Sequence, residues 1–246
     1  MSSAPRPAID PRVVAPSVVV ALKPAGFWAR YMAWSLDAVL IAILTCVIGA
    51  SHWRFKIAAA REAYAVLNKR MADVMSGSVL NDMDFGGFAQ QLMTDPVVHA
   101  ASTAVVDATT SLIFGWIFLF ALFGLLYEVG FVAFSSWQAT PGKRALGLRV
   151  TALDGGKLGL GPAVVRYLAG SLSWLTLNIG HVMAMAKPEH RALHDRIASA
   201  RVLRTGAAAT PLWGWAWLLL QTFATLAACV WLMRMMQTAM DAALAI

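Results

Sequence analysis

The stretch Leu112–Phe134, LIFGWIFLFALFGLLYEVGFVAF, decides the fold, because Glu128 is its only charged residue. About 20 helical residues, each rising about 1.5 Å, cross a hydrocarbon core of roughly 30 Å. The stretch therefore predicts a membrane-spanning helix, which we place at 108–134. Asp107 argues against an earlier start, because an ionisable side chain is costly in lipid.

Two further apolar stretches have the same character, and we expect spans near 27–50 and 212–236. Aromatic residues such as Trp28 and Trp213 stand at their starts, as in the aromatic belts of membrane interfaces. Hydrophobic residues make up 59% of the 246 residues and charged ones 13%. A soluble domain has about 45–50% apolar residues and about 25% charged residues. Both departures indicate a membrane protein.

The net charge of +7 raises the question of nucleic-acid binding. The basic residues stand at the ends of the apolar stretches, however, where the positive-inside rule places them. We therefore expect a lipid bilayer with anionic headgroups as the partner, and no nucleic acid.

The segment 52–102 carries five basic and five acidic residues. Apolar residues recur at helical spacing from Ile57 to Met75, and Ser-Gly and Gly-Gly breaks follow. This pattern predicts an amphipathic helix and then a loop, both outside the membrane core.

The segment 163–186 is apolar but contains Arg166, Asn178 and His181. The short segments on either side of it, 135–161 and 187–211, both have a basic excess, which the cytoplasm should retain. The two basic segments can both lie on the cytoplasmic side only if 163–186 does not cross the membrane. We therefore favour a re-entrant or interfacial segment broken near Asn178 over a fourth span, with the N-terminus cytoplasmic and the C-terminus outside.

A short β-hairpin is predicted on the same side of the membrane. Leu148, Val150 and Ala152 alternate before an Asp-Gly-Gly turn, and the segment 197–203 can supply an antiparallel partner. We pair 148–152 with 198–202.

The candidate ion-site residues are Asp37, Glu128, Arg30 and Asp195. The site rests on Asp37 and Glu128, which lie about 10 Å below the predicted cytoplasmic surface in two different spans. Two carboxylates at one depth can hold a cation or share a proton. The alternative is that each is neutralised separately by Arg30, Arg144 or Arg166, which fixes the fold and moves nothing.

Other motifs predict no chemistry. Pro141-Gly-Lys-Arg144 is not a phosphate-binding loop, because it lacks the earlier glycine and the Ser/Thr. His190 and His194 have a zinc-compatible spacing, but Arg191 stands where a metalloprotease has Glu. We expect no metal, no cofactor, no catalytic residues and no enzymatic activity.

Three motifs in order resemble the RDD family of membrane proteins. The first is Arg30 with Asp37, the second is the run from Thr140, Pro141, Gly142 and Lys143 through Gly147 to Val150, and the third is Arg166 with the run Arg191–Arg196, which contains His194 and Asp195. The family is named after one arginine and two aspartates, which Arg30, Asp37 and Asp195 match. The chain departs from the family in its long 52–102 insertion and in the added helix 212–236.

The resemblance implies a proposed role in transport, since some members are similar to sodium/proton antiporters in activity. We therefore expect an all-α bundle with a short cytoplasmic β-hairpin, having three spans and a re-entrant segment, or four spans. Its parts are a flexible tail (1–22), an RDD-like domain (23–204) and an extra helix (205–246).

The expected function is transport of a small ion or solute in a bacterial inner membrane, by cation/proton exchange. The alternative is a non-transporting assembly, scaffold or accessory protein. A cation or proton is the expected ligand, homo-oligomerisation stays open, and Asp195 and His194 are expected to anchor the hairpin.

Overall fold

The computed structural model describes residues 22–206 and 210–244, so the predicted N-terminal tail lies almost entirely outside the described residues. Three of the described helices are long and apolar enough to cross a membrane: Phe27–Ile48, Pro96–Phe134 and Leu212–Thr238. The predicted fold class, a helical membrane protein with a small two-stranded sheet, is confirmed. The segment 163–186 is not among these candidate spans.

The elements are as follows, in chain order: α1 Phe27–Ile48, α2 Ala50–Leu80, α3 Phe85–Thr94, α4 Pro96–Val129, the π-helix η1 Gly130–Phe134, α5 Pro141–Ala145, β1 Leu148–Ala152, α6 Leu160–Leu175, α7 Ile179–Val182, the 3-10 helix η2 Met183–Met185, α8 Leu193–Ile197, β2 Ala200–Arg204 and α9 Leu212–Leu244.

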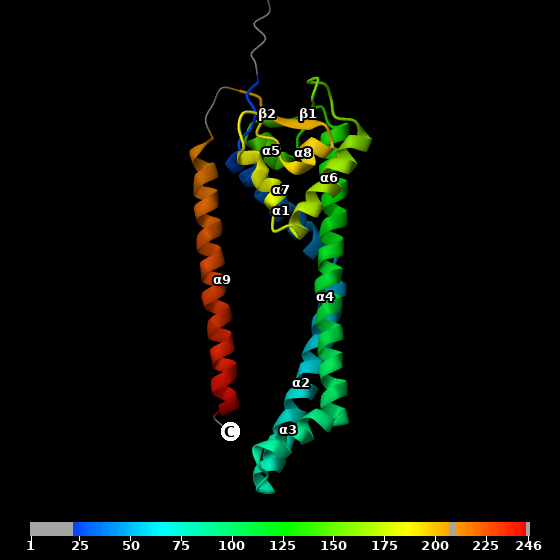
Figure 1. The fold of residues 1–246 in the computed structure, drawn as a ribbon, viewed down its shortest axis with the longest axis vertical. Helices are drawn as coiled ribbons and strands as arrows, with labels where there is room; N and C mark the ends of the chain where they lie inside the picture. The colour runs from blue at the N-terminus through cyan, green and yellow to red at the C-terminus, as the bar shows by residue number, and fades with distance from the viewer. Residues whose placement is uncertain (1–21, 207–209, 245–246) are drawn as a thin grey trace, which may run out of the picture.

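The elements divide into a head and two extensions (Figure 1). We call residues 22–38 and 125–206 the head, and residues 50–110 the arm. The head gathers the sheet, the short helices, the start of α1 and the end of α4. In the arm, α2 and α4 pack against each other and α3 joins them, while α9 stands apart from the arm.

The core of the head is built from the small sheet and the ends of two spans. Its buried side chains include Met32 of α1, Val132 of η1, and Val150 and Val202 of the sheet. The strands pair antiparallel, with Leu148 opposite Arg204 and Ala152 opposite Ala200. The hairpin prediction was therefore two residues out of register, because α8 continues to Ile197 and β2 begins only at Ala200. A two-residue shift leaves every side chain on its predicted face.

The break predicted in 163–186 is confirmed. Helix α6 ends at Leu175, and Leu177 and Asn178 follow with φ angles of 51° and 65°. Asparagine tolerates this left-handed conformation better than most residues. Since α6 has 16 residues, about 24 Å at the usual rise, it falls short of a hydrocarbon core of about 30 Å.

The prediction for 52–102 was wrong in its loop. Helix α2 continues through Ser76 and Gly77, and α3 contains the Gly-Gly pair. Helix α4 begins at Pro96 rather than near 108, because the Asp95 carboxylate accepts hydrogen bonds from the Val97 and Val98 amides. An Asp followed by Pro is a strong helix start. The continuous helix Pro96–Phe134 has 39 residues, almost twice the length that a bilayer requires.

Candidate functional site

Asp195 lies at the centre of a buried ion-pair network in the head. Its side chain is fully buried and forms salt bridges with Arg30 of α1 and with Arg166 of α6, the latter at 2.9 Å. It also accepts a hydrogen bond from the Ala192 amide at 3.2 Å, at the start of α8. One carboxylate therefore connects the first span, α6 and the segment that leads into β2.

Arg166 extends this network to Glu128. Its guanidinium pairs with Asp195 on one side and with Glu128 of α4 on the other, and it lies 3.3 Å from the His194 ring. Glu128 has a second cation, since the Lys143 Nζ lies 3.2 Å from its Oε1. Arg166 is 5% exposed, so these pairs form largely out of contact with solvent.

Asp37 belongs to a separate set of contacts in which every partner is uncharged. Its carboxylate accepts hydrogen bonds from the Tyr127 hydroxyl at 2.8 Å, from the Gly142 amide at 2.7 Å and from the Thr140 hydroxyl. Three donors satisfy an ionised carboxylate without a cation. Asp37 thereby fastens the short helix α5, with Pro141 in its first turn, to the first span.

Gly142 is required by this contact. A Cβ atom at this position would lie 2.3 Å from the Ala33 carbonyl oxygen and 2.8 Å from the Asp37 carboxylate. Since the nearest atom belongs to a helix backbone, it cannot move aside. The loop can approach α1 this closely only with glycine. Gly147, at the other end of the motif, has a φ of 63° and allows the chain to turn into β1.

The protonation states in the network follow from burial and from neighbouring charges. Burial alone would raise the pKa of Asp195, but the guanidinium groups of Arg166 and Arg30 outweigh it and hold the pKa well below its ordinary value of 3.8. Burial lowers the pKa of His194 to about 3, although Asp195 opposes the shift. At neutral pH Asp195 is therefore ionised and His194 is neutral.

The structure brings the predicted residues together, but not as a shared carboxylate pair. Arg30 binds Asp195 rather than Asp37, although both lie on α1. Glu128 has Lys143 and Arg166, whereas Asp37 has none of the predicted cations among its described partners. The alternative of separate neutralisation agrees with the geometry for Glu128. For Asp37, hydroxyl and amide groups take the place of the cation.

Sequence reasoning missed two polar side chains that complete these contacts. Tyr127 precedes Glu128 and binds Asp37, and Ser35 accepts hydrogen bonds from Trp217 at 3.0 Å and Gln221 at 2.9 Å. A signal was available, since a polar atom inside an apolar span requires a partner. Only the fold identifies which partner it finds.

Comparisons with known proteins agree with this arrangement. The model of the RDD family matches residues 24–199. The chain belongs to the RDD family. An uncharacterized protein of Bacillus subtilis (strain 168), YxaI, is 26% identical over 181 residues, which cover 74% of this chain and 97% of that relative. No solved structure matches. The family match contains the whole ion-pair network and ends before α9, and the chain is a multi-pass membrane protein.

Proposed function

We propose that this RDD protein is a homo-oligomeric membrane assembly protein whose head is a rigid anchoring unit. The observation that carries the proposal is that the carboxylates of Asp37, Glu128 and Asp195 in the head are all already paired with hydrogen-bond donors or cations. A site that moves an ion needs at least one charged group free to exchange partners. Here each buried carboxylate already has donors from several elements.

The buried ion pairs also oppose the entry of a further cation. Glu128 and Asp195 already pair with three cations, which are Arg30, Lys143 and Arg166. Removing one partner from a buried pair typically costs about 3–5 kcal/mol, which opposes exchange and favours a fixed structure.

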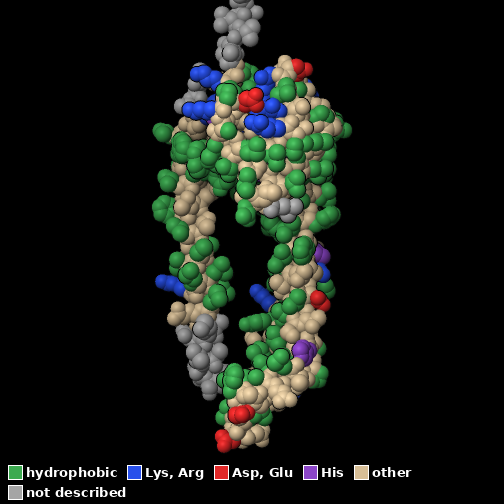
Figure 2. Space-filling view, viewed as in Figure 1, with side chains coloured by type: hydrophobic (Ala, Val, Ile, Leu, Met, Phe, Trp, Pro, Cys, Tyr) green, Lys and Arg blue, Asp and Glu red, His purple; other side chains and the backbone are tan. Residues whose placement is uncertain are grey.

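The spans support self-association, because their surfaces have few partners within the chain. In the most apolar stretch of α9, none of the residues is buried within the chain. In the most apolar stretch of the 96–134 helix, 17% of the residues are buried. Helix α9 meets α1 near the head through Ser35 and through Trp28 beside Trp215. Figure 2 shows open space between the two extensions below the head. We propose that a second copy packs there.

The two cysteines of the chain test this proposal without new side chains. Cys46 on α1 and Cys229 on α9 are both free and exposed. A disulfide forms only when two Cα atoms come within about 7 Å. Mild oxidation of native membranes should give a covalent dimer that is lost in Cys46→Ala or Cys229→Ala.

The mass of the protein in lipid nanodiscs, measured under reducing conditions, should be that of two or more chains of 26.5 kDa. A monomeric mass, with no cross-link in membranes, would rule out the assembly proposal. A multimeric mass without a cross-link would place the interface away from the cysteines and would still support self-association.

We propose ion transport as a second candidate, because Asp37 is a buried carboxylate in a span and its partners are uncharged. Such a group can in principle bind a proton or a small cation in place of its hydroxyl donors. Proteoliposomes containing a pH-sensitive dye should then show cation-dependent proton flux that Asp37→Asn abolishes while the protein stays folded. The absence of flux from the wild-type protein over a series of cations would remove this candidate. Neither candidate involves catalysis.

We also propose that the head faces the cytoplasm of a bacterial inner membrane. Figure 2 shows Lys and Arg side chains gathered on the outer surface of the head, where the positive-inside rule expects them. In a cysteine-free background, a membrane-impermeant thiol reagent should modify Asn81→Cys at the tip of the arm but not Asp154→Cys in the head. The opposite labelling would reverse the orientation.

A further inference from the structure

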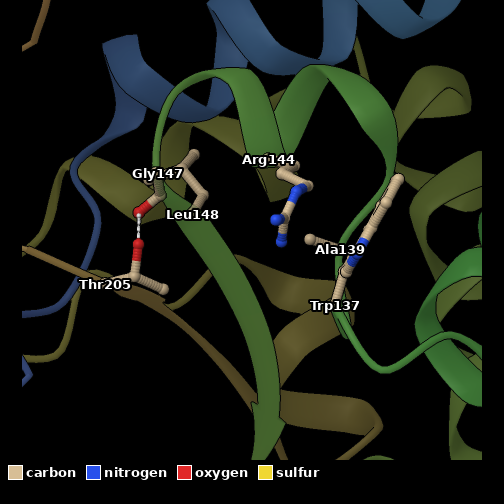
Figure 3. A pocket seen from close by; sticks show the side chains of 6 residues that line it. All are labelled: Trp137, Ala139, Arg144, Gly147, Leu148 and Thr205. Carbon is tan, nitrogen blue, oxygen red and sulfur yellow. Dashed lines mark hydrogen bonds between the residues drawn. The ribbon is translucent and has the colours of Figure 1, made fainter.

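A pocket of about 290 Å³ opens on the head between α5, β1 and the residue that follows β2 (Figure 3). Its lining consists of Trp137, Ala139, Arg144, Gly147, Leu148 and Thr205. The Arg144 guanidinium points into the space between Trp137 and the start of β1 (Figure 3). It is the only charged side chain among the lining residues.

Arg144 differs from the neighbouring basic residues of the same motif. Lys143 pairs with Glu128, and the Arg149 guanidinium donates to the Gln138 side chain. Arg144 instead stacks over the Trp137 ring, 4.4 Å from its centroid, and is exposed. Within residues 22–206 and 210–244, no salt bridge to an acidic side chain engages it. The guanidinium is held in place and keeps hydrogen-bond donors for an external group.

The pocket is lined by residues that lie close in sequence to the ends of two candidate spans. Trp137 follows the end of the second candidate span by three residues and stacks on Phe131 of η1. Thr205 directly follows β2, shortly before α9 begins with the half-exposed Trp213 and Trp215. Tryptophans at the end of a span mark the headgroup region of a bilayer.

We propose that this pocket binds the phosphate group of a phospholipid headgroup. A guanidinium presents parallel N–H donors that match two phosphate oxygens, and it does so best when stacking fixes its plane. Trp137 provides that stacking, three residues past the end of a candidate span. None of the six lining residues belongs to the ion-pair network.

The test measures lipid binding by purified, delipidated full-length protein in an uncharged detergent. Native mass spectrometry would follow phosphatidylglycerol bound to the wild type and to Arg144→Gln. The matched control is Arg61→Gln, which removes an exposed positive charge from the arm. We expect roughly tenfold weaker binding in Arg144→Gln, an intermediate loss in Arg144→Lys, and no change in Arg61→Gln.

Two further measurements identify the source of the phosphate. A glycolipid without phosphate should show no dependence on Arg144, and millimolar inorganic phosphate should not displace phosphatidylglycerol. Displacement by inorganic phosphate would replace the lipid with a soluble phosphate ligand and overturn the proposal. Equal binding to the wild type, Arg144→Gln and Arg61→Gln, with unchanged melting temperatures, would remove the site altogether.

Discussion

The head and the arm use opposite means of holding helices together. In the head, Asp195, Arg166 and Lys143 are buried, and the pair of Asp195 with Arg30 connects elements 165 residues apart along the chain. In the arm, α2 and α4 share an alanine-lined groove, and large apolar side chains such as Leu80 and Phe85 at its tip are more than 80% exposed. Hydrophobic burial adds little between helices already in lipid, so charged and polar contacts specify the head. The arm has few such contacts, and substitutions should therefore have larger effects in the head.

Asp195→Asn should have the largest effect. It leaves the guanidinium groups of Arg30 and Arg166 buried without their shared carboxylate, which should cost about 3–5 kcal/mol. We expect a large drop in folded yield and in melting temperature in detergent. The control is Asp154→Asn, in an exposed turn, which should behave as the wild type. Equal melting temperatures for the two variants would remove the distinction between buried and exposed charges on which the comparison depends.

Acid should destabilise the head through the same network. Because burial lowers the pKa of His194 from 6.5 to about 3, the unfolded chain binds a proton that the folded head excludes. Stability should therefore fall as the pH decreases below 6.5, and Asp195 should add to the loss below 3.8.

Melting curves of His194→Gln should show a smaller decrease between pH 6.5 and 3.8. The variant for comparison is His181→Gln. Burial also lowers the pKa of the neighbouring His181, although this ring is less buried than the ring of His194. An unchanged pH profile in His194→Gln would mean that other groups determine the acid response.

Gly142→Ala should destabilise the contact between α5 and the first span by about 1–3 kcal/mol, because the added methyl group overlaps the Ala33 carbonyl. The control is Gly161→Ala on α6, where no atom lies within 4 Å of the added methyl group. That variant should be as stable as the wild type or slightly more stable, since alanine favours a helix. Equal melting temperatures for the two alanine variants would show that the loop can move away from α1.

Ser35→Ala should loosen α9 with a smaller cost of about 1 kcal/mol. It leaves the Trp217 and Gln221 donors without their shared acceptor, and hydrogen bonds between membrane helices contribute little each. Hydrogen exchange should increase in the first turns of α9 and stay unchanged in β1. Ser171→Ala removes an exposed hydroxyl from α6 and serves as the control. Slow exchange in α9 of Ser35→Ala would mean that other contacts hold this helix.

Arg70→Ala should have the smallest effect. The Arg70 guanidinium lies 2.6 Å from Asp95 between α2 and α4, but its side chain is 37% exposed, and exposed ion pairs stabilise little. We expect no change in the melting of the head and faster hydrogen exchange confined to the arm. Arg61→Ala, exposed on the same helix, should change neither quantity. A lower melting temperature of the head would show that the arm and the head unfold together.

The sequence by itself determined the spans, the interrupted helix at Asn178, the strand pair and the family. Each of these is a local property: apolar length, a left-handed residue, alternation, or a run of motif residues. The start of α4 is also a local property, because Asp95 followed by Pro96 is a helix-start signal. It could therefore have been predicted.

Only the tertiary structure decided which charges meet. Arg30 binds Asp195, 165 residues away, rather than Asp37 on its own helix, and Asp37 is satisfied by Tyr127, Thr140 and Gly142. Twenty Lys and Arg residues offer many partners for each carboxylate, and no periodicity distinguishes among them. The selection follows from desolvation, because a buried charge is stable only where packing places enough donors or acceptors around it at once.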